Sequence, residues 1–321
     1  MKRTLMLPIA AIFCFSVCCV PAAIADDEVA KKAVLITGAS SGIGLKITEK
    51  LAGNGFYVYA GARKDADLER LNAMENVSSV KLDVTVKEDI DAAVEFVRHQ
   101  GRGLHGVVNN AGVGSISSLA TGLETDMDFV FGVNVYGPYR VNQAFLPLLD
   151  ENDGRTTIVG SASGTIARKS SGIYSMSKFA VEAYTDSLAR ELAGNGVHVS
   201  IVEPGGFKSG FIADRAARAL AAANKGEIEL TAEERARHED AAARSASQRE
   251  PDEVADAILD LMTAERPKRR YMVMPNERQA QAVIEAAMRR LVQLNHDQPY
   301  AYDREGLIAV LDELLAEIDS D

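Results

Sequence analysis

The most restrictive feature of this sequence is a glycine-containing turn that joins a short apolar run to a helical pattern. Residues 33–37 are typical of a buried strand, and Gly38, Gly42 and Gly44 follow directly before the helix. Glycines at such a turn permit positive φ angles and let a pyrophosphate approach backbone N–H groups at the positive end of a helix dipole. Other tight turns also contain glycines, but a strand before and a helix after favour a dinucleotide as the ligand.

From residue 32 onward the chain alternates β-rich runs with helical periodicity, the pattern of a parallel sheet covered on both faces. Seven strands are predicted near residues 33–37, 56–60, 77–82, 106–109, 156–160, 197–202 and 271–274. With 321 residues, 47% of them apolar, the chain can bury one large core without disulfides or metals. We therefore expect an α/β fold with a doubly wound (Rossmann) seven-stranded parallel sheet, in a single domain of residues 32–275.

The charge and the cysteines exclude several classes of function. The net charge of −11 gives no positive field to attract DNA, RNA or an anionic membrane, so we expect no nucleic-acid partner. All three cysteines, Cys14, Cys18 and Cys19, lie in the first twenty residues, which leaves none for a disulfide framework, a thiolate nucleophile or a zinc site in the folded body. The five histidines are scattered without metal-ligand spacing, so no metal site is expected.

The first 25 residues have the pattern of a secretion signal. Lys2 and Arg3 precede an apolar run over residues 5–20, and Ala23 and Ala25 place small residues where a signal peptidase cuts. We expect cleavage after Ala25 and an exported, periplasmic protein. An uncleaved membrane anchor is the first alternative, and a cytoplasmic product of a misassigned start codon is the second.

Two helical segments depart from the simple alternation of strands and helices. Residues 211–249 are rich in Ala, Glu and Arg, with a helix start at Thr231, and indicate a helical insertion after the sixth strand. Residues 276–321 are predicted to form a C-terminal helical extension packed on the same domain. An apolar stripe runs along this extension at Leu307, Leu311, Leu314, Leu315 and Ile318. The stripe favours packing on its own domain, with a subunit contact as the alternative.

A tyrosine and a lysine one helical turn apart form the candidate catalytic pair. Tyr174 and Lys178 lie near the start of a helix predicted to run to Gly194, so both side chains share one face. A free phenol has a pKa of about 10, and a nearby positive charge favours the phenolate. We expect Lys178, together with an oxidised nicotinamide, to lower the pKa of Tyr174. Ser161 follows the fifth strand, where open parallel sheets bind their ligands.

The glycine spacing resembles that of the short-chain dehydrogenase/reductase family. The turn reads Thr-Gly-x-x-x-Gly-x-Gly, which differs from the Gly-x-Gly-x-x-Gly of two-domain dehydrogenases. Further matching motifs are Leu82-Asp-Val-Thr, Asn109-Asn-Ala-Gly, Asn134 within Val-Asn-Val-Tyr-Gly, and Pro204-Gly205. The resemblance covers about residues 32–209, and residues 181–192 and 203–207 look most like the steroid and retinol dehydrogenase branch.

The resemblance implies a role for each member of the site. Ser161 would position the carbonyl or alcohol oxygen, Tyr174 would act as general acid and base, and Lys178 would hold the nicotinamide ribose. Asn134 would anchor a water in the proton relay. The implied cofactor-binding residues are Gly38, Ser40, Ser41, Gly42, Ile43, Gly44, Arg63, Asp83, Val84, Asn110, Ala111, Gly112, Tyr174, Lys178, Pro204, Gly205, Phe207 and Ser209.

The end of the second strand indicates which cofactor is used. An acid at this position binds the ribose 2′-hydroxyl of NAD, whereas an arginine favours the 2′-phosphate of NADP. Here the acid position is Ala62 and Arg63 follows it, which favours NADP, with NAD as the alternative. Two arguments favour NAD. Many NADP-preferring relatives carry a basic residue at the position of Ser41, and Arg63 could be a solvated loop charge.

We therefore expect an NAD(P)(H)-dependent oxidoreductase that interconverts a secondary alcohol and a ketone or aldehyde by hydride transfer. The resemblance implies a small, apolar substrate under a mobile lid of residues 207–250, and a homodimer or homotetramer. The alternative is a catalytically silent NADP-binding sensor or scaffold, which the apparent export signal favours. A membrane contact is expected only if the N-terminal segment is uncleaved.

Overall fold

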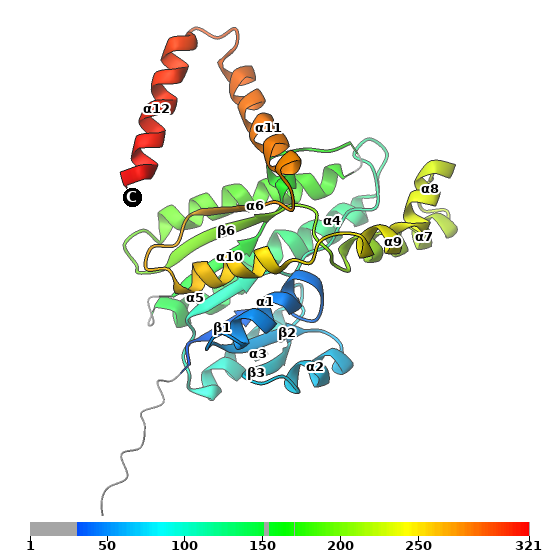
Figure 1. Ribbon diagram of the computed structural model, residues 1–321. Helices are drawn as coiled ribbons and strands as arrows, with labels where there is room; N and C mark the ends of the chain where they lie inside the picture. Colours follow the sequence, from blue (N-terminus) through cyan, green and yellow to red (C-terminus); the bar gives the residue numbers. More distant parts are fainter. Residues whose placement is uncertain (1–30, 151–153, 170, 321) are drawn as a thin grey trace, which may run out of the picture. The chain divides into compact units, whose positions relative to one another are not determined.

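The computed structural model describes residues 31–150, 154–169 and 171–320, and the predicted secretion signal at residues 1–25 lies outside them. Seven parallel strands form one sheet in the order β3-β2-β1-β4-β5-β6-β7 (Figure 1). The strands are β1 (Ala33–Ile36), β2 (Tyr57–Ala62), β3 (Val77–Lys81), β4 (Gly106–Asn109), β5 (Arg155–Val159), β6 (His198–Pro204) and β7 (Arg270–Val273). All seven agree with the predicted strands to within about two residues, and the doubly wound parallel sheet is confirmed.

Alternating residues of the strands pack against helices on the two faces of the sheet. The helices that follow the first strands are α1 (Gly42–Ala52), α2 (Asp65–Asn72), α3 (Lys87–Gln100), α4 (Glu124–Asn134), α5 (Tyr136–Asp150) and α6 (Gly172–Glu191). In β1, Val34 and Ile36 pack with α1 and with α10 (Asp252–Thr263) on one face. Ala33 and Leu35 face the opposite way and pack with α3 and α5. Burial on both faces explains the unbroken apolar runs of these strands.

The strand order reverses between β1 and β4, and this reversal places the site. β1 pairs with β2 on one side and with β4 on the other, so the connections leave the sheet in opposite directions. Open parallel sheets bind their ligands outside the carboxyl ends of the strands at such a point. The glycine turn after β1 and the Asn109–Gly112 loop after β4 both lie there.

The insertion after β6 is helical, as predicted. It contains α7 (Phe211–Asn224), α8 (Ala232–Glu239) and α9 (Ala241–Ala246). Thr231 starts α8 through a capping box, in which its hydroxyl accepts from the Glu234 N–H and the Glu234 carboxylate accepts from the Thr231 N–H.

The C-terminal extension contains α11 (Glu277–Asn295) and α12 (Arg304–Ser320). The start of α11 contacts the domain, because the Gly206 N–H donates to Gln279 Oε1 at 3.1 Å and Val283 is buried. On α12, Leu311, Leu314 and Leu315 are about half exposed and Ile318 is 74% exposed. Leu307 on the same stripe is partly buried, and the packing of the stripe on its own domain stays a prediction.

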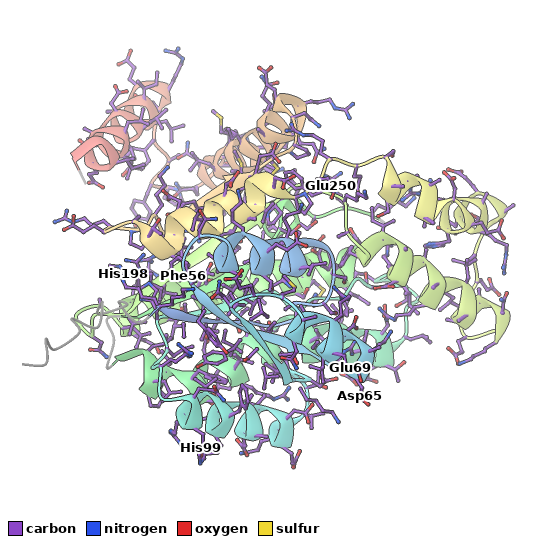
Figure 2. All side chains as sticks on the ribbon, turned by 60° about the horizontal axis from the view of Figure 1, so that its bottom comes forward. Phe56, Asp65, Glu69, His99, His198 and Glu250 are labelled. Carbon is purple, nitrogen blue, oxygen red and sulfur yellow. The ribbon has the colours of Figure 1, made fainter. Side chains whose placement is uncertain are left out.

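The histidines lie on separate elements, as Figure 2 shows for His99 on α3 and His198 at the start of β6. Over the described ranges, no three or more His, Cys, Asp or Glu side chains gather as metal ligands would. Within the same ranges, no helix has the length and apolar character needed to cross a bilayer.

Candidate active site

A cavity of about 730 Å³ opens at the carboxyl ends of the strands, where the sheet order reverses. Ser161 and all eighteen predicted cofactor-binding residues line it, from Gly38 at the glycine turn to Ser209 before α7. Asn134 is the one predicted site residue that does not line it. Residues from widely separated motifs are thus brought to one cavity.

The glycine turn has the backbone geometry that a dinucleotide needs. Gly38 and Gly42 adopt positive φ angles of 64° and 54°, and α1 begins at Gly42. A Cβ at Gly44 would lie 2.2 Å from the Gly38 carbonyl oxygen and 2.4 Å from Asn110 Nδ2. Only glycine therefore allows α1 to start this close to the end of β1. The N–H groups at the start of α1 are available to a pyrophosphate, so the residues present fit a dinucleotide.

Thr37 joins the glycine turn to the loop after β4. Its hydroxyl accepts from the N–H groups of Asn110 and Ala111, each at 3.0 Å. In return, Asn110 Nδ2 donates to the carbonyl oxygens of Thr37 and Gly38 at 2.9 and 3.0 Å. These four hydrogen bonds hold the two sides of the switch point together. Thr37 begins the Thr-Gly-x-x-x-Gly-x-Gly motif, but its pairing with Asn110 can be recognised only once β1 and β4 are adjacent.

Arg63 follows β2 and Asp83 follows β3, and both line the cavity. Their side chains form an ion pair at 3.6 Å, with the Arg63 side chain 64% exposed. Burial raises the pKa of Asp83, but hydrogen bonds from Thr85 and the charge of Arg63 outweigh it and leave the pKa below its ordinary value. The carboxylate is therefore ionised, and the exposed guanidinium has donors left for an additional anion.

Ser161 and Tyr174 are brought together by β5 and α6. Ser161 lies two residues after β5, in extended backbone, and Tyr174 lies in the first turn of α6. Burial raises the pKa of Tyr174 to about 12, and a hydrogen bond with Ser161 opposes this rise. The protein's own groups therefore keep the phenol protonated. The lowered pKa predicted for Tyr174 requires an oxidised nicotinamide together with Lys178, and it stays a prediction.

Lys178 is almost completely buried beside Tyr174. Its Nζ donates to the Val159 carbonyl oxygen at 2.8 Å and lies 5.6 Å from the centre of the Tyr174 ring. Burial lowers the pKa of Lys178 to about 8, against the attraction of Glu182 one turn further along α6. Burial and the neighbouring Glu203 in turn raise the pKa of Glu182 to about 8. Lys178 is therefore a cation at neutral pH in a poorly hydrated site.

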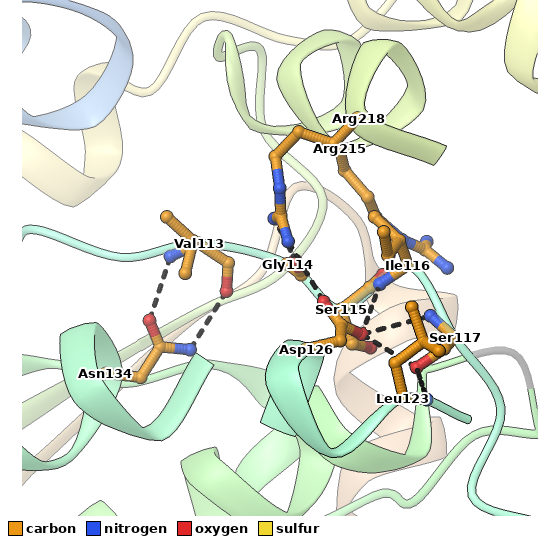
Figure 3. Close-up of polar contacts among 10 residues, drawn as sticks. All are labelled: Val113, Gly114, Ser115, Ile116, Ser117, Leu123, Asp126, Asn134, Arg215 and Arg218. Atoms are coloured by element: carbon orange, nitrogen blue, oxygen red, sulfur yellow. Dashed lines mark hydrogen bonds and ion pairs between the residues drawn. The ribbon is translucent and has the colours of Figure 1, made fainter. Parts of the chain in front are cut away.

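Asn134 supports the site from outside the cavity. Its Oδ1 accepts from the Val113 N–H at 2.8 Å, and its Nδ2 donates to the Val113 carbonyl oxygen at 2.9 Å (Figure 3). The same Nδ2 donates to Ser177 Oγ at 3.0 Å. These contacts fix the loop after β4 against α6. The side chain of Asn134 therefore holds protein backbone and Ser177, and the expected role of Asn134 in anchoring a water stays a prediction.

The motifs did not identify the residues that close the substrate end of the cavity. The Phe211 ring lies 5.1 Å from the ring of Tyr174, measured between centroids. Other unpredicted lining residues are Arg168 and Ser171 before α6, Ile212 and Arg215 on α7, Arg244 and Gln248 at α9, and Arg278 and Gln279 on α11. Arg168 and Ser171 come from the segment between β5 and α6, and the others come from the insertion and the C-terminal extension. None of them lies in one of the motifs.

The phosphate-binding turn at one end of the cavity and the Ser161–Tyr174–Lys178 group at the other define a dinucleotide-dependent oxidoreductase. Residues 32–219 match the family model described as short chain dehydrogenase. The chain therefore belongs to the short-chain dehydrogenase family and is an NAD(P)-dependent oxidoreductase of small-molecule alcohols and carbonyl compounds.

Curated relatives and solved structures agree with this membership. The chain is 38% identical over 190 residues to the uncharacterized oxidoreductase YbbO of Escherichia coli K12. The aligned region covers 59% of this chain and 70% of the relative. It is 39% identical over 181 residues to mouse retinol dehydrogenase 5, covering 55% of this chain and 57% of that relative. A short-chain dehydrogenase/reductase from Burkholderia phymatum, solved in complex with NAD, matches with a TM-score of 0.71 and 26% identity over 85% of this chain and 98% of that one.

Proposed function

We propose that this protein uses NADP(H) to interconvert an apolar alcohol and the corresponding ketone or aldehyde. The observation that carries the proposal is the lining of one cavity by the glycine turn, Arg63 and the Ser161–Tyr174–Lys178 group. Solved structures similar to this chain include one described with NAD and one described with NADP, so both nucleotides occur among its neighbours. Arg63 directly follows β2, and neither of its neighbours, Ala62 and Lys64, is acidic. An arginine rather than an acid at this place supports NADP.

The chain's own residues supply binding and proton transfer at the substrate oxygen. When bound, the reduced nicotinamide supplies the hydride that the carbonyl carbon accepts. Ser161 orients the carbonyl oxygen by a hydrogen bond, and Tyr174, protonated at neutral pH, donates its proton to that oxygen. The Lys178 cation, held by the Val159 carbonyl oxygen, stabilises the tyrosinate that remains. In alcohol oxidation the same groups act in reverse.

The names of the relatives support a reaction at an alcohol. They include retinol dehydrogenases and mitochondrial D-beta-hydroxybutyrate dehydrogenases. Phe207, Phe211 and Ile212 line the substrate end of the cavity and offer apolar contacts. The silent sensor or scaffold has no support in the site, because Ser161, Tyr174 and Lys178 all line the same cavity.

Purified protein should oxidise NADPH when mixed with members of a panel of apolar ketones and aldehydes, and should oxidise NADH more slowly. The Tyr174→Phe variant distinguishes site chemistry from a contaminating reductase. If nucleotide binds but no panel member is reduced, the silent alternative gains support.

We also propose a homodimer or homotetramer formed through α5 and α6. Tyr136 and Tyr139 on α5 and Met176 on α6 are large apolar side chains that are more than 40% exposed. Such residues are enriched in the buried centres of interfaces. Light scattering should give a mass of two or four chains, and Tyr139→Glu should shift it toward one.

The N-terminal segment supports a further proposal, that the protein is exported to the periplasm. Its support is the charge of Lys2 and Arg3, the apolar run after them and the small residues up to Ala25. N-terminal sequencing of native protein from cell fractions should give Asp26 as the first residue of a periplasmic species. An intact N-terminus in the membrane or cytoplasmic fraction would favour the anchor or the cytoplasmic alternative.

A further inference from the structure

A buried carboxylate joins the lid helix α7 to the loop that follows β4. The Asp126 side chain, in the first turn of α4, is 1% exposed. Its Oδ2 accepts from the N–H groups of Ile116 and Ser117 at 2.8 and 3.0 Å and from Ser117 Oγ at 3.0 Å (Figure 3). This carboxylate oxygen therefore fixes the conformation of the loop.

The other oxygen of the same carboxylate binds the lid. Arg218 on α7 donates from Nη2 to Asp126 Oδ1 at 2.9 Å and from Nη1 to the Gly114 carbonyl oxygen at 2.7 Å. Its guanidinium also lies 4.3 Å from the centre of the Phe129 ring. A charge-assisted pair with a desolvated partner is stronger than a surface ion pair, so Arg218 holds α7 at this position.

A second arginine and a glycine complete the contact. Arg215, one turn before Arg218, donates from Nε to the Ser115 carbonyl oxygen at 2.5 Å. A Cβ at Gly114 would lie 2.9 Å from both Phe211 Cζ and Arg215 Cδ. The absence of a side chain at Gly114 thus lets the lid helix pack directly on the loop backbone.

The contact reaches the reacting group through Phe211, which begins α7 and whose ring lies 5.1 Å from that of Tyr174. Neither Asp126 nor Arg218 lines the cavity, whereas Phe211 and Arg215 do. The pair therefore acts on the cavity only through the placement of α7.

We propose that Asp126 and Arg218 are positioning residues that clamp α7 over the substrate end of the cavity and so set the affinity for the alcohol or carbonyl substrate. The part that concerns substrate affinity rests on the proposed function, whereas the clamp itself does not. Opening of α7 would separate Phe211 from Tyr174 and admit water to the phenol. Closed, α7 excludes water from the group that transfers the proton.

The test compares Arg218→Gln with the control Arg237→Gln, which removes an exposed arginine paired with Glu233 in the same insertion. Hydrogen exchange of residues 211–224 should become about tenfold faster in Arg218→Gln than in the control, the loss expected for one charged hydrogen bond. The KM for an active carbonyl compound should rise by about the same factor with kcat largely retained, because ground-state and transition-state binding weaken together.

Two further variants keep the test decisive. Asp126→Asn retains an acceptor for the loop N–H groups but loses the charge, so it should loosen α7 without loosening residues 114–117. A lysine has one ammonium group in place of the two-pronged guanidinium, so Arg218→Lys can pair with Asp126 but cannot also reach the Gly114 carbonyl oxygen. Hydrogen exchange of α7 in Arg218→Lys should be faster than in the wild type and slower than in Arg218→Gln. If exchange of α7 in Arg218→Gln matches the control, the clamp is refuted whatever the activity. Faster exchange with an unchanged KM refutes the role in substrate affinity, and faster exchange in a protein without any turnover refutes the proposed function while the clamp stands.

Discussion

The ammonium nitrogen of Lys178 lies 2.8 Å from the carbonyl oxygen of Val159, so α6 is tied to the last residue of β5. Ser161 lies two residues beyond that tie, and Tyr174 lies one turn before Lys178. One hydrogen bond therefore sets the relative position of the strand that provides the serine and the helix that provides the tyrosine. The same bond requires a cation to be buried, which has a measurable cost.

Replacing Lys178 by Met should stabilise the folded protein at neutral pH while impairing catalysis. Burial lowers the pKa of Lys178 from 10.5 to about 8, so at pH 7 the folded chain holds a poorly solvated cation. We expect Lys178→Met to raise the free energy of unfolding by about 1 kcal/mol at pH 7. Turnover should fall by about 100-fold or more, because the tyrosinate loses its cation.

The pH dependence of the difference in unfolding free energy between Lys178→Met and the wild type tests whether burial of the cation causes it. Between pH 8 and 10.5 the unfolded chain binds the Lys178 proton more tightly than the folded chain, so wild-type stability rises with pH in this window. The variant lacks this titration, and its advantage should shrink as the pH rises from about 7 to about 9.5. Urea unfolding of both proteins at about pH 7 and about pH 9.5 measures this difference in the free energy of unfolding. A difference that stays constant would show that desolvation of the cation is not its source.

Adding one methyl group to the glycine turn should damage both folding and nucleotide binding. In Gly44→Ala the new Cβ would lie 2.2 Å from the Gly38 carbonyl oxygen, and neither backbone segment can move without breaking the Thr37–Asn110 hydrogen bonds. We expect a loss of about 1–3 kcal/mol in the free energy of unfolding and weaker binding of NADPH.

Gly132→Ala on α4 is the matched control, because nothing lies within 4 Å of its added Cβ. It should be neutral or stabilising by up to about 1 kcal/mol, as expected for alanine in a helix. Equal effects of the two substitutions would contradict a specific requirement for glycine at position 44.

Arg63 should discriminate between the two nicotinamide nucleotides. Its side chain is largely exposed and forms an ion pair with Asp83. It can therefore bind a 2′-phosphate without first being moved out of a buried position. Arg63→Gln should weaken NADPH binding about tenfold or more and leave NADH binding nearly unchanged, measured by fluorescence titration. Arg98→Gln, which removes an exposed arginine paired with Glu95 on α3, is the control. An equal loss for both nucleotides would place Arg63 on the adenine or pyrophosphate instead.

The cofactor side of the site could be predicted from the sequence because its residues follow strands in short motifs. Gly38, Asp83 and Asn110 come within two residues after a strand, and Pro204 is the last residue of β6. Parallel strands bring such residues to one edge of the sheet. The contacts of the Asn134 side chain could not be predicted from its motif, because its partner Val113 lies on a loop of no regular structure.

The substrate side could not be predicted for a different reason. Phe211 and Arg218 lie in an insertion whose composition indicates only solvated helices, and their partners Tyr174 and Asp126 are far away in the sequence. The pKa of Tyr174 likewise depends on burial, which no local pattern reports. The amphipathic pattern of α12 predicted a covered stripe, but periodicity alone does not identify what covers it.

The most direct test of the account is the rate of NADPH oxidation by Tyr174→Phe with a carbonyl compound that the wild type reduces. The variant keeps the aromatic ring packed on Phe211 and loses only the hydroxyl that donates the proton. Turnover should fall by about 10²–10⁴-fold while NADPH affinity is retained. Tyr184→Phe on the same helix, whose hydroxyl contacts Asn142 away from the cavity, should retain turnover. Wild-type turnover in Tyr174→Phe would contradict the assignment of this tyrosine as the proton donor.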